Sequence, residues 1–309
     1  MRDIWIVAEN AAWAATLVSA AKSLDQDCAI TAFVRGDEAA AKDAVTYGAA
    51  SAFALPLPAA GLWEDYAPAL AEKAKADKPA FILISSSRRG RDLAAKTAAL
   101  LDAPSFSDAA QLALSGDTFS CGTSVFGGTA VRTASTSAPV VIVTLGAKSY
   151  EPAAADASRS GAVATLPYSA GAAKVTERKP REKQSVNLPE ATKVVGVGRG
   201  FSEEKDLAAA RELAAAIGAE VGCSRPIAEF FKWMPEECYV GISGQVLKPQ
   251  LYVAVGISGQ AQHTFGVRDA KVIVSINKDE ECLMHQNADY YIVGTWQDAI
   301  PAIIKAAKA

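Results

Sequence analysis

Short apolar runs alternate with longer, alanine-rich segments along the first hundred residues. The apolar runs predict strands at residues 4–8, 29–34, 52–55 and 80–85. The alanine-rich segments predict helices at residues 11–24, 38–47, 62–75 and 91–101. Strands that alternate with helices in this way indicate βαβ units and a parallel sheet.

The same alternation returns in the last third of the chain. It predicts strands at residues 193–197, 220–223, 251–255, 272–276 and 290–293, and a closing helix at 296–308. Ser202 is the expected N-cap of a helix that ends near Ile217 and stops at Gly218. A further helical stretch is expected through Trp233. The predicted fold class is α/β, with two Rossmann-like doubly wound domains at residues 1–192 and 193–309.

The middle of the chain interrupts this pattern. From Ser107 the segments shorten, and residues 140–145 form an apolar run, so we expect added or edge strands that complete the first domain. Residues 151–189 contain many Ala, Ser, Pro and charged residues. The basic cluster in this stretch consists of Lys174, Arg178, Lys179, Arg181 and Lys183. We interpret the later part of the stretch as a connecting segment.

Composition and charge exclude several classes of function, including nucleic-acid binding. The chain has 309 residues, enough for two cores, and its 31 Lys and Arg against 34 Asp and Glu give a net charge of −3. It therefore lacks the basic field of a nucleic-acid-binding protein. The five cysteines show no metal-binding spacing, so we expect reduced thiols, no metal site and a cytoplasmic location. No apolar run approaches the roughly 20 residues that cross a bilayer, and the amino terminus does not resemble a signal peptide.

Glycines and polar residues follow the predicted strands of the second domain. The strand at 251–255 runs into a glycine loop that carries Ser258, and the strand at 272–276 runs into Asn277. Glycines let backbone N–H groups approach a phosphate closely. Because the carboxyl ends of parallel strands converge on one crevice, we expect both segments to touch a single ligand.

Two further glycine motifs strengthen this expectation. The pentapeptide GISGQ occurs at 241–245 and again at 256–260, which we interpret as two loops that meet one ligand, with coincidence as the alternative. Gly196 to Gly200 reads GVGRG, which differs from the GxGxxG loop of NAD enzymes. Alone it is as typical of a tight strand-to-helix turn as of a phosphate site, but Arg199 favours anion binding.

Several longer motifs carry a resemblance to a known family. They are LYVAVGISGQAQHTFGVRDAKVIVSINKD at 251–279, CSRP at 223–226, VGRG at 197–200, LKPQLY at 247–252 and NADYYIVG at 287–294. Together they resemble the α subunit of electron transfer flavoproteins. YVGIS at 239–243 and the segment 224–234 are most similar to the branch associated with nitrogen fixation and carnitine reduction. The resemblance spans the chain and is densest from about Lys193.

This resemblance implies an FAD site in the carboxy-terminal domain. It implies that the ribityl and phosphate portion of FAD contacts Arg199, Ser224, Ser258 and Gly259. The adenosine end would contact Asn277 and Lys278. The other implied contacts are Val240, Gly241, Ile242, Gln260, Ala261, Gln262, Thr295 and Trp296. In sequence alone, Asn277 and Lys278 are equally typical of a solvated turn.

Three residues are expected to tune the flavin rather than to act as catalytic side chains. The resemblance places Arg225 over the isoalloxazine ring, Ser243 at N5 and His263 near O2. Because Pro226 follows Arg225, we expect the Arg225 backbone to avoid the helical region; a structural salt bridge is its alternative role. A protonated or donating His263 would stabilise charge at O2, whereas an isolated histidine is usually structural. Ile242 and Thr295 replace a glutamine and an acidic residue common in the family.

The resemblance also implies partners. A β subunit holding AMP or a second FAD is expected, together with a donor dehydrogenase or NADH-linked donor and an acceptor oxidoreductase, with electron bifurcation as one option. The first domain would contact the β subunit without binding a nucleotide. Its SSSRRGR turn at 85–91 suggests anion binding by itself, with a solvated basic turn as the alternative.

Other readings remain open from the residues alone. Phe230, Phe231 and Trp233 are better explained as packing than as an electron path. The rival functions are a nicotinamide-dependent dehydrogenase with two dinucleotide-binding folds and a non-catalytic adenine-nucleotide-binding module. The chain offers no His/Asp or Lys/Tyr catalytic set for the first of these.

Overall fold

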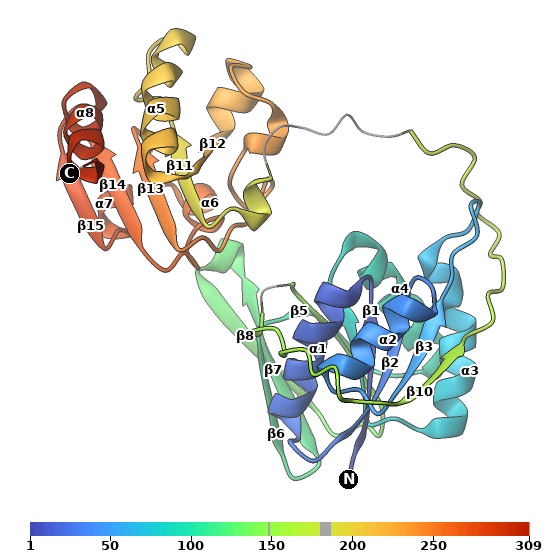
Figure 1. Ribbon diagram of the computed structural model, residues 1–309. Coiled ribbons are helices and arrows are strands. Elements are labelled where there is room, and N and C mark those ends of the chain that lie inside the picture. Colours follow the sequence, from blue (N-terminus) through green and yellow to red (C-terminus); the bar gives the residue numbers. More distant parts are fainter. Residues whose placement is uncertain (148, 180–186, 309) are drawn as a thin grey trace. The chain divides into compact units, whose positions relative to one another are not determined.

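The structure is a computed structural model that describes residues 1–147, 149–179 and 187–308. The chain divides into two compact units, one formed by Met1–Val125 with Thr129–Pro180 and the other by Phe126–Gly128 with Arg181–Ala309. Each unit contains a parallel sheet with helices packed against it (Figure 1). The predicted α/β fold class is confirmed.

The first unit is built on a seven-stranded sheet of order β10-β3-β2-β1-β4-β9-β5. Its strands are β1 Asp3–Ala8, β2 Ala29–Arg35, β3 Ser51–Leu55, β4 Phe81–Ser85, β5 Ser105–Ala109, β9 Val141–Leu145 and β10 Ala162–Thr165. All of the paired strands run parallel. The order reverses between β1 and β4, as in a doubly wound fold.

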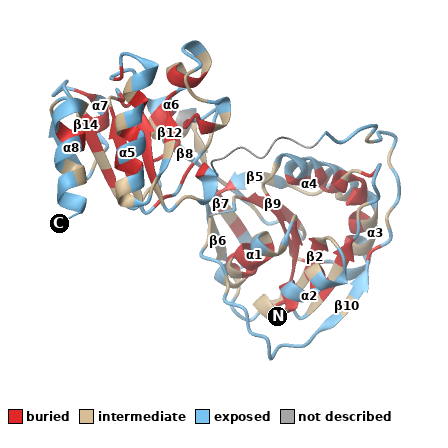
Figure 2. Ribbon diagram, turned by 45° about the horizontal axis from the view of Figure 1, so that its top comes forward, coloured by how far each residue is buried: buried red, intermediate tan, exposed pale blue. Residues whose placement is uncertain are grey.

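Helices cover both faces of this sheet. They are α1 Ala11–Leu24, α2 Glu38–Tyr47, α3 Ala67–Asp77, which follows the 3₁₀ turn Trp63–Tyr66, and α4 Arg88–Leu101. Alternate residues of β1 face opposite cores: Ile4 and Ile6 pack with α1 and α2, whereas Trp5 and Val7 pack with α3 and α4. The central strands β1, β4 and β9 are therefore almost entirely apolar, because both of their faces are buried (Figure 2).

The irregular middle of the chain forms a separate antiparallel sheet and also adds strands to the parallel sheet. The strands β6 Gln111–Ser115, β7 Thr118–Val125 and β8 Ala130–Thr136 make a separate antiparallel sheet, which is the added element that we expected. The expectation was wrong for β9, which lies inside the parallel sheet between β4 and β5. Its apolar sequence VIVTL is fully buried, as an internal strand requires. The strand β10, at the edge beside β3, was not predicted.

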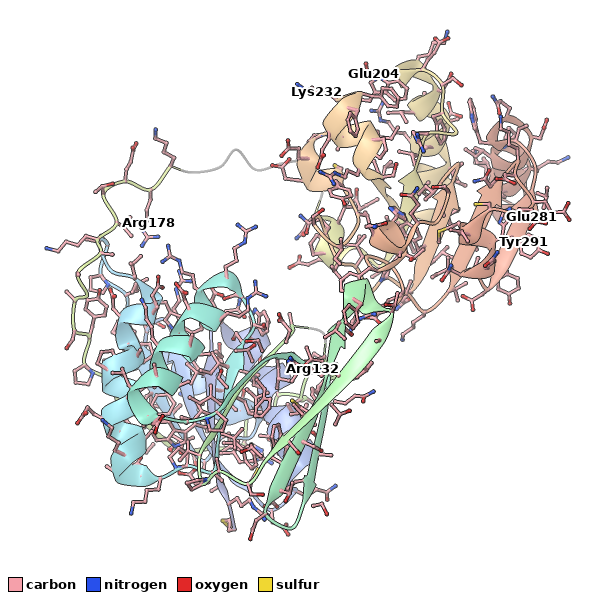
Figure 3. All side chains as sticks on the ribbon, turned by 180° about the vertical axis from the view of Figure 1, so that it is seen from behind. Arg132, Arg178, Glu204, Lys232, Glu281 and Tyr291 are labelled. Atoms are coloured by element: carbon pink, nitrogen blue, oxygen red, sulfur yellow. The ribbon has the colours of Figure 1, made fainter. Side chains whose placement is uncertain are left out.

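The stretch before the second unit lies partly against the first unit. Tyr168 donates its hydroxyl hydrogen to Asp65 at 2.6 Å, and the Arg178 guanidinium donates to the carbonyls of Ala59 and Gly61 at 3.3 and 3.2 Å (Figure 3). The expected connecting segment is therefore anchored at Arg178. Arg181 and Lys183 of the basic cluster lie outside the described residues.

The second unit is built on a five-stranded parallel sheet of order β12-β11-β13-β14-β15. Its strands are β11 Lys193–Val197, β12 Glu220–Cys223, β13 Leu251–Val255, β14 Ile273–Asn277 and β15 Tyr290–Val293. Its α-helices are α5 Leu207–Ile217, α6 Ala261–Thr264, α7 Leu283–Gln286 and α8 Trp296–Ala307. A short π-helix spans Pro226–Phe230, and 3₁₀ turns occur at Leu188–Glu190, Glu204–Asp206 and Glu236–Cys238.

The start of α5 differs from the prediction, whereas its end agrees. Ser202 is not the N-cap, because a 3₁₀ turn comes first and the Asp206 carboxylate accepts from the backbone N–H of Glu203 at 3.1 Å. The helix proper begins at Leu207. Gly218 stops it in the left-handed region, with φ of 65°. Among the described residues, no helix is long and apolar enough to cross a membrane.

Candidate functional site

A cavity of about 760 Å³ lies at the carboxyl ends of β11, β12, β13 and β14. Eleven of the predicted residues line it: Arg199, Ser224, Arg225, Ile242, Ser243, Ser258, Gln260, Gln262, His263, Asn277 and Lys278. A second cavity of about 250 Å³ adjoins it and is lined by Arg199, Asn277, Lys278, Thr295 and Trp296 among others. The two cavities share five lining residues, so together they form one elongated site. This site lies along the edge of the sheet where the strand order reverses.

Four predicted contacts do not line either cavity. Val240 is fully buried, and Ala261 is the exposed first residue of α6. At Gly241 and Gly259 the space for a side chain is taken by the protein itself: a Cβ would lie 2.8 Å from the Tyr239 hydroxyl and 2.1 Å from the Met284 nitrogen, respectively. These glycines are therefore explained by internal packing.

Gly200 and Gly256 bring the ends of β11 and β13 together. A Cβ on Gly200 would lie 2.5 Å from the Gly256 Cα, and a Cβ on Gly256 would lie 2.6 Å from the Gly200 Cα. The Gly200 N–H donates to the Gly256 carbonyl at 3.0 Å, and Gly256 has a φ of 63°. Only glycine permits this approach at both positions. Both glycines line both cavities, so the contact forms the floor that the two cavities share.

The two GISGQ loops contribute to the larger cavity together. Ile242 and Ser243 come from the first loop, and Ser258 and Gln260 from the second. The Ile242 N–H donates to the carbonyl of Gln262 at 2.8 Å, which ties the first loop to the helix α6 that follows the second. The repeat therefore supplies two walls of one cavity.

Arg225 begins the π-helix and pairs with an acidic residue on it. Its φ and ψ are both −46°, so the expectation that Pro226 would keep this backbone out of the helical region was wrong. The turn Ser224–Ile227 and the Phe231 N–H bond to the Pro226 carbonyl hold it there. The guanidinium donates to Glu229 at 2.6 Å, and this hydrogen bond raises the pKa of Arg225. The side chain is 59% exposed and lines the cavity.

His263 is buried at the cavity wall, with 7% of its surface exposed. Its Nε2 lies 2.9 Å from the Tyr252 hydroxyl, and its Nδ1 has no hydrogen-bond partner in the described part of the chain. Burial lowers the pKa of His263 to about 4, against the opposing effect of the Val240 carbonyl. The ring is therefore neutral at neutral pH, which removes the protonated form from the two that we expected and leaves the donating one.

The hydroxyl of Ser243 is shared with a residue that the sequence did not single out. Tyr239 Oη lies 3.1 Å from Ser243 Oγ, and Tyr239 also lines the cavity. Either oxygen can donate, so the pair can present a hydrogen to a ligand or accept one.

Asn277 holds the cavity loops together. Its amide nitrogen donates to the Ile257 carbonyl at 3.0 Å and to Cys282 Sγ at 3.1 Å, while its oxygen accepts from the Asp279 N–H at 3.1 Å. Cys282 Sγ also lies 3.2 Å from the Ile257 carbonyl. Asn277 is therefore not a solvated turn residue, and its amide nitrogen is used within the protein. Cys282 was missed because a single cysteine carries no spacing signal.

The site carries exposed side chains of both charges that form no ion pair with the described residues. Arg199 and Lys278 are exposed, line both cavities and form no hydrogen bond or ion pair with the described residues. Asp279 and Glu281 are the acidic lining residues of the larger cavity, and Glu281 is labelled in Figure 3. Two cations beside a glycine floor can bind an anionic group such as a diphosphate.

The far end of the second cavity is built by the start of α8. Thr295 caps this helix by accepting from the Asp298 N–H, and its hydroxyl donates to the Asp298 carboxylate at 2.6 Å. The Trp296 indole donates to the Gly200 carbonyl at 3.1 Å and stacks on Phe201 at 4.9 Å. Trp296 therefore connects the glycine floor to α8.

The three aromatic residues that follow Arg225 lie in two different environments. Phe231 and Trp233 stack at 4.7 Å, and Trp233 packs against the core, as the packing interpretation predicts. Phe230 lines the cavity and is 75% exposed. It offers an apolar surface at the cavity mouth.

Two arginines of the basic turn in the first unit pair with acidic residues, whereas Arg88 is exposed and forms no ion pair with the described residues. Arg89 pairs with Glu64 at 2.6 Å and Arg91 with Asp108 at 3.0 Å, while Ser87 caps α4 by accepting from the Gly90 N–H. These contacts oppose anion binding at the turn. No group of three potential metal ligands occurs among the described residues of either unit.

Comparisons with known proteins agree with this geometry. The electron transfer flavoprotein domain model matches residues 4–170, and the electron transfer flavoprotein FAD-binding domain model matches residues 187–268. The chain is 36% identical over 307 residues to "Putative electron transfer flavoprotein subunit YdiR" of Escherichia coli K12, covering 98% of this chain and 97% of the relative. This chain belongs to the electron transfer flavoprotein family.

Further relatives extend this similarity. The chain is 37% identical over 308 residues to "Protein FixB" of Salmonella typhimurium and 36% identical to "Protein FixB" of Escherichia coli O157:H7, each covering 98% of this chain and 97% of the relative. The family predicted from the sequence is thus confirmed, with FAD-dependent electron transfer as the function. The matched FAD-binding segment ends before Asn277, Lys278, Thr295 and Trp296.

The buried His263 predicts a pH dependence of stability. The unfolded imidazole takes up a proton near pH 6.5, whereas the folded one resists protonation until about pH 4. Between these values the unfolded state binds more protons, so stability falls as the pH falls. In the flavin-free chain, we compare how far the free energy of unfolding falls when the pH is lowered from 7 to about 4.5. The fall should be about 2 to 3 kcal/mol larger for the wild type than for His263→Gln.

Denaturant titrations of both proteins at the two pH values measure this difference. Carboxylates that titrate in the same range affect both proteins alike, so they cancel in the comparison. Equal losses in the two proteins would show that His263 is charged, or exposed to water, in the folded state.

Proposed function

We propose that this chain is the α subunit of a heterodimeric electron transfer flavoprotein and binds one FAD along the carboxyl ends of the second sheet. The observation that carries the proposal is the extended site, in which two adjoining cavities share a glycine floor and two unpaired cations. An elongated dinucleotide with a central diphosphate matches that arrangement. We also propose the domain division at residues 192 and 193.

Each region of the site suits one part of FAD. The diphosphate would lie at Gly200 and Gly256 beside Arg199, with Ser258 as a hydroxyl donor. The larger cavity, with apolar Ile242 and Phe230 at its walls, would take the isoalloxazine ring. The smaller one would take the adenosine end beside Trp296.

The side chains of this subunit would bind and tune the cofactor. The bound flavin supplies the redox chemistry, so the protein needs no acid, base or nucleophile of its own. Arg225 would place a positive charge beside the ring, and neutral His263 would offer a hydrogen bond without a charge. We therefore infer that the chain is an electron carrier rather than an enzyme, and that the rival dehydrogenase and nucleotide-binding readings do not apply.

The proposed assembly includes other proteins. A β subunit holding AMP or a second FAD would pair with this chain, chiefly through residues 1–192, and a bifurcating complex would require the second FAD. Electrons would arrive from a dehydrogenase or an NADH-linked donor and leave to an acceptor oxidoreductase. The free cysteines agree with a reducing compartment such as the cytoplasm.

Co-expression with a candidate β subunit tests the whole proposal. The complex should purify as a stable heterodimer, with one FAD per α chain released on denaturation and identified by its absorbance spectrum. Nucleotide analysis of the same sample assigns AMP or a second FAD to the β subunit. A colourless heterodimer after gentle purification, even with FAD added, would contradict the proposal.

Ser258→Leu tests the placement of the diphosphate. Leucine at this exposed loop position would block close approach to Gly256, so FAD occupancy should fall at least about tenfold while the chain still folds. The matched control is Ser115→Leu, at an exposed position of the first unit. FAD content is measured by absorbance and folding by circular dichroism; full occupancy in Ser258→Leu would remove this loop from the site.

Arg225→Ala tests the tuning of the ring. The variant should keep FAD but lower the potential for uptake of the first electron, because a positive charge that stabilises the reduced ring is lost. Arg225→Lys should fall between, since lysine keeps the charge and loses the planar group.

Glu229→Gln is the matched control, because it breaks the same ion pair and keeps the arginine. Its potential should not fall. Spectroelectrochemical titration compares the four proteins, and a wild-type potential in Arg225→Ala would make Arg225 a structural ion-pair residue.

A further inference from the structure

The hydroxyl of Tyr252 is buried in the middle of the second sheet and contacts His263. Tyr252 lies on β13 with none of its surface exposed, and its Oη is 2.9 Å from His263 Nε2. Burial is the main cause that raises the pKa of Tyr252 far above its ordinary value, and Cys223 adds to the shift. The phenol therefore keeps its hydrogen at neutral pH.

The direction of this hydrogen bond follows from what surrounds it. Nε2 is the only hydrogen-bond partner of Tyr252 Oη in the described part of the chain. If Nε2 carried the hydrogen, the phenol O–H would be a buried donor without an acceptor, and a bare Nδ1 would remain without a donor. If the phenol donates, Nε2 is satisfied and the ring hydrogen is on Nδ1. The second arrangement leaves fewer unpaired groups and is favoured.

The neighbouring strands make room for this contact. A Cβ on Gly196 of β11 would lie 1.9 Å from Tyr252 Oη and 2.5 Å from Cζ, so the tyrosine ring occupies the space that a side chain at 196 would need. On β12, burial raises the pKa of Cys223 to about 12, so this thiol is neutral too. Tyr252 and Cys223 beside it are thus both uncharged.

We propose that Tyr252 is a positioning residue for the flavin site: by donating to Nε2 it fixes His263 as the Nδ1–H tautomer. The hydrogen on the buried Nδ1 then belongs to a residue that lines the larger cavity. Gly196 also contributes to this arrangement, because the absence of a side chain at this position leaves space for the Tyr252 ring. The tautomer stands on this chain alone; only its effect on the cofactor rests on the proposed function.

A fixed tautomer has a consequence for a bound flavin. An N–H donor held in one orientation favours whichever form of the ring carries more negative charge, which is the reduced one. Loss of the Tyr252 hydroxyl would let the histidine hydrogen move to Nε2, and the donor at Nδ1 would become an acceptor. The midpoint potential should then fall.

The tautomer can be measured directly because the chain has only two histidines, His263 and His285. The full chain is labelled with ¹⁵N-histidine, and His285→Gln assigns the remaining signals to His263. We expect protonated Nδ1 and bare Nε2 at neutral pH, with a preference of at least about tenfold. In Tyr252→Phe, which keeps the ring in the core, the two tautomers should approach equal populations.

The matched control is Tyr66→Phe, which removes a buried hydroxyl in the first unit, 2.5 Å from the Pro56 carbonyl. It should leave the His263 tautomer and the flavin potential unchanged. Gly196→Ala is an independent variant that keeps Tyr252 but displaces its hydroxyl; where it folds, it should reproduce the tautomer change of Tyr252→Phe. Potentials are measured on the flavin-loaded complex.

Three results would overturn the inference. A wild-type His263 with its hydrogen on Nε2 would reverse the hydrogen bond, and an unchanged tautomer in Tyr252→Phe would show that Tyr252 does not set it. An altered tautomer with an unchanged flavin potential would refute the role in the flavin site. A wild-type complex without FAD would refute the proposed function instead, because the tautomer measurement does not require the cofactor.

Discussion

The close approach of Gly200 to Gly256 is the constraint on which the site depends. The two backbones lie so near each other that a Cβ on either glycine would be within 2.6 Å of the other Cα. This contact joins the loops after β11 and β13, the strands on either side of the reversal in strand order. Arg199 and Ser258 belong to these loops, and the Trp296 indole bonds to the Gly200 carbonyl. A larger residue at either glycine would move Arg199, Ser258 and Trp296 apart.

Around this floor, the site combines exposed charges with a buried neutral donor. Arg199 and Lys278 stay in water, where an anionic ligand can replace their hydration at small cost. His263 is buried and loses its charge, because the sheet offers it a phenol and no carboxylate. Arg225 occupies an intermediate place, since it is exposed and paired with Glu229. Binding and tuning of a flavin can therefore be altered separately.

The two units use one architecture differently. In the first, the turn at the strand ends is filled by its own ion pairs, Arg89 with Glu64 and Arg91 with Asp108. In the second, the corresponding edge of the sheet keeps cations without partners and opens into cavities. The fold alone thus does not make a nucleotide site; the loops and side chains at the strand ends decide it.

The sequence by itself determined the α/β class, five of the seven strands of the first parallel sheet, all five of the second and the stop of α5 at Gly218, because apolar periodicity and glycine are local signals. Its motifs also indicated the family and eleven residues of the larger cavity. The position of β9 inside the sheet and the 3₁₀ turn before α5 were decided by burial and backbone hydrogen bonds that no local pattern records. The same is true of Tyr252, which reads as an ordinary core strand residue. Its hydroxyl meets His263 only because Gly196 on the neighbouring strand leaves space for it.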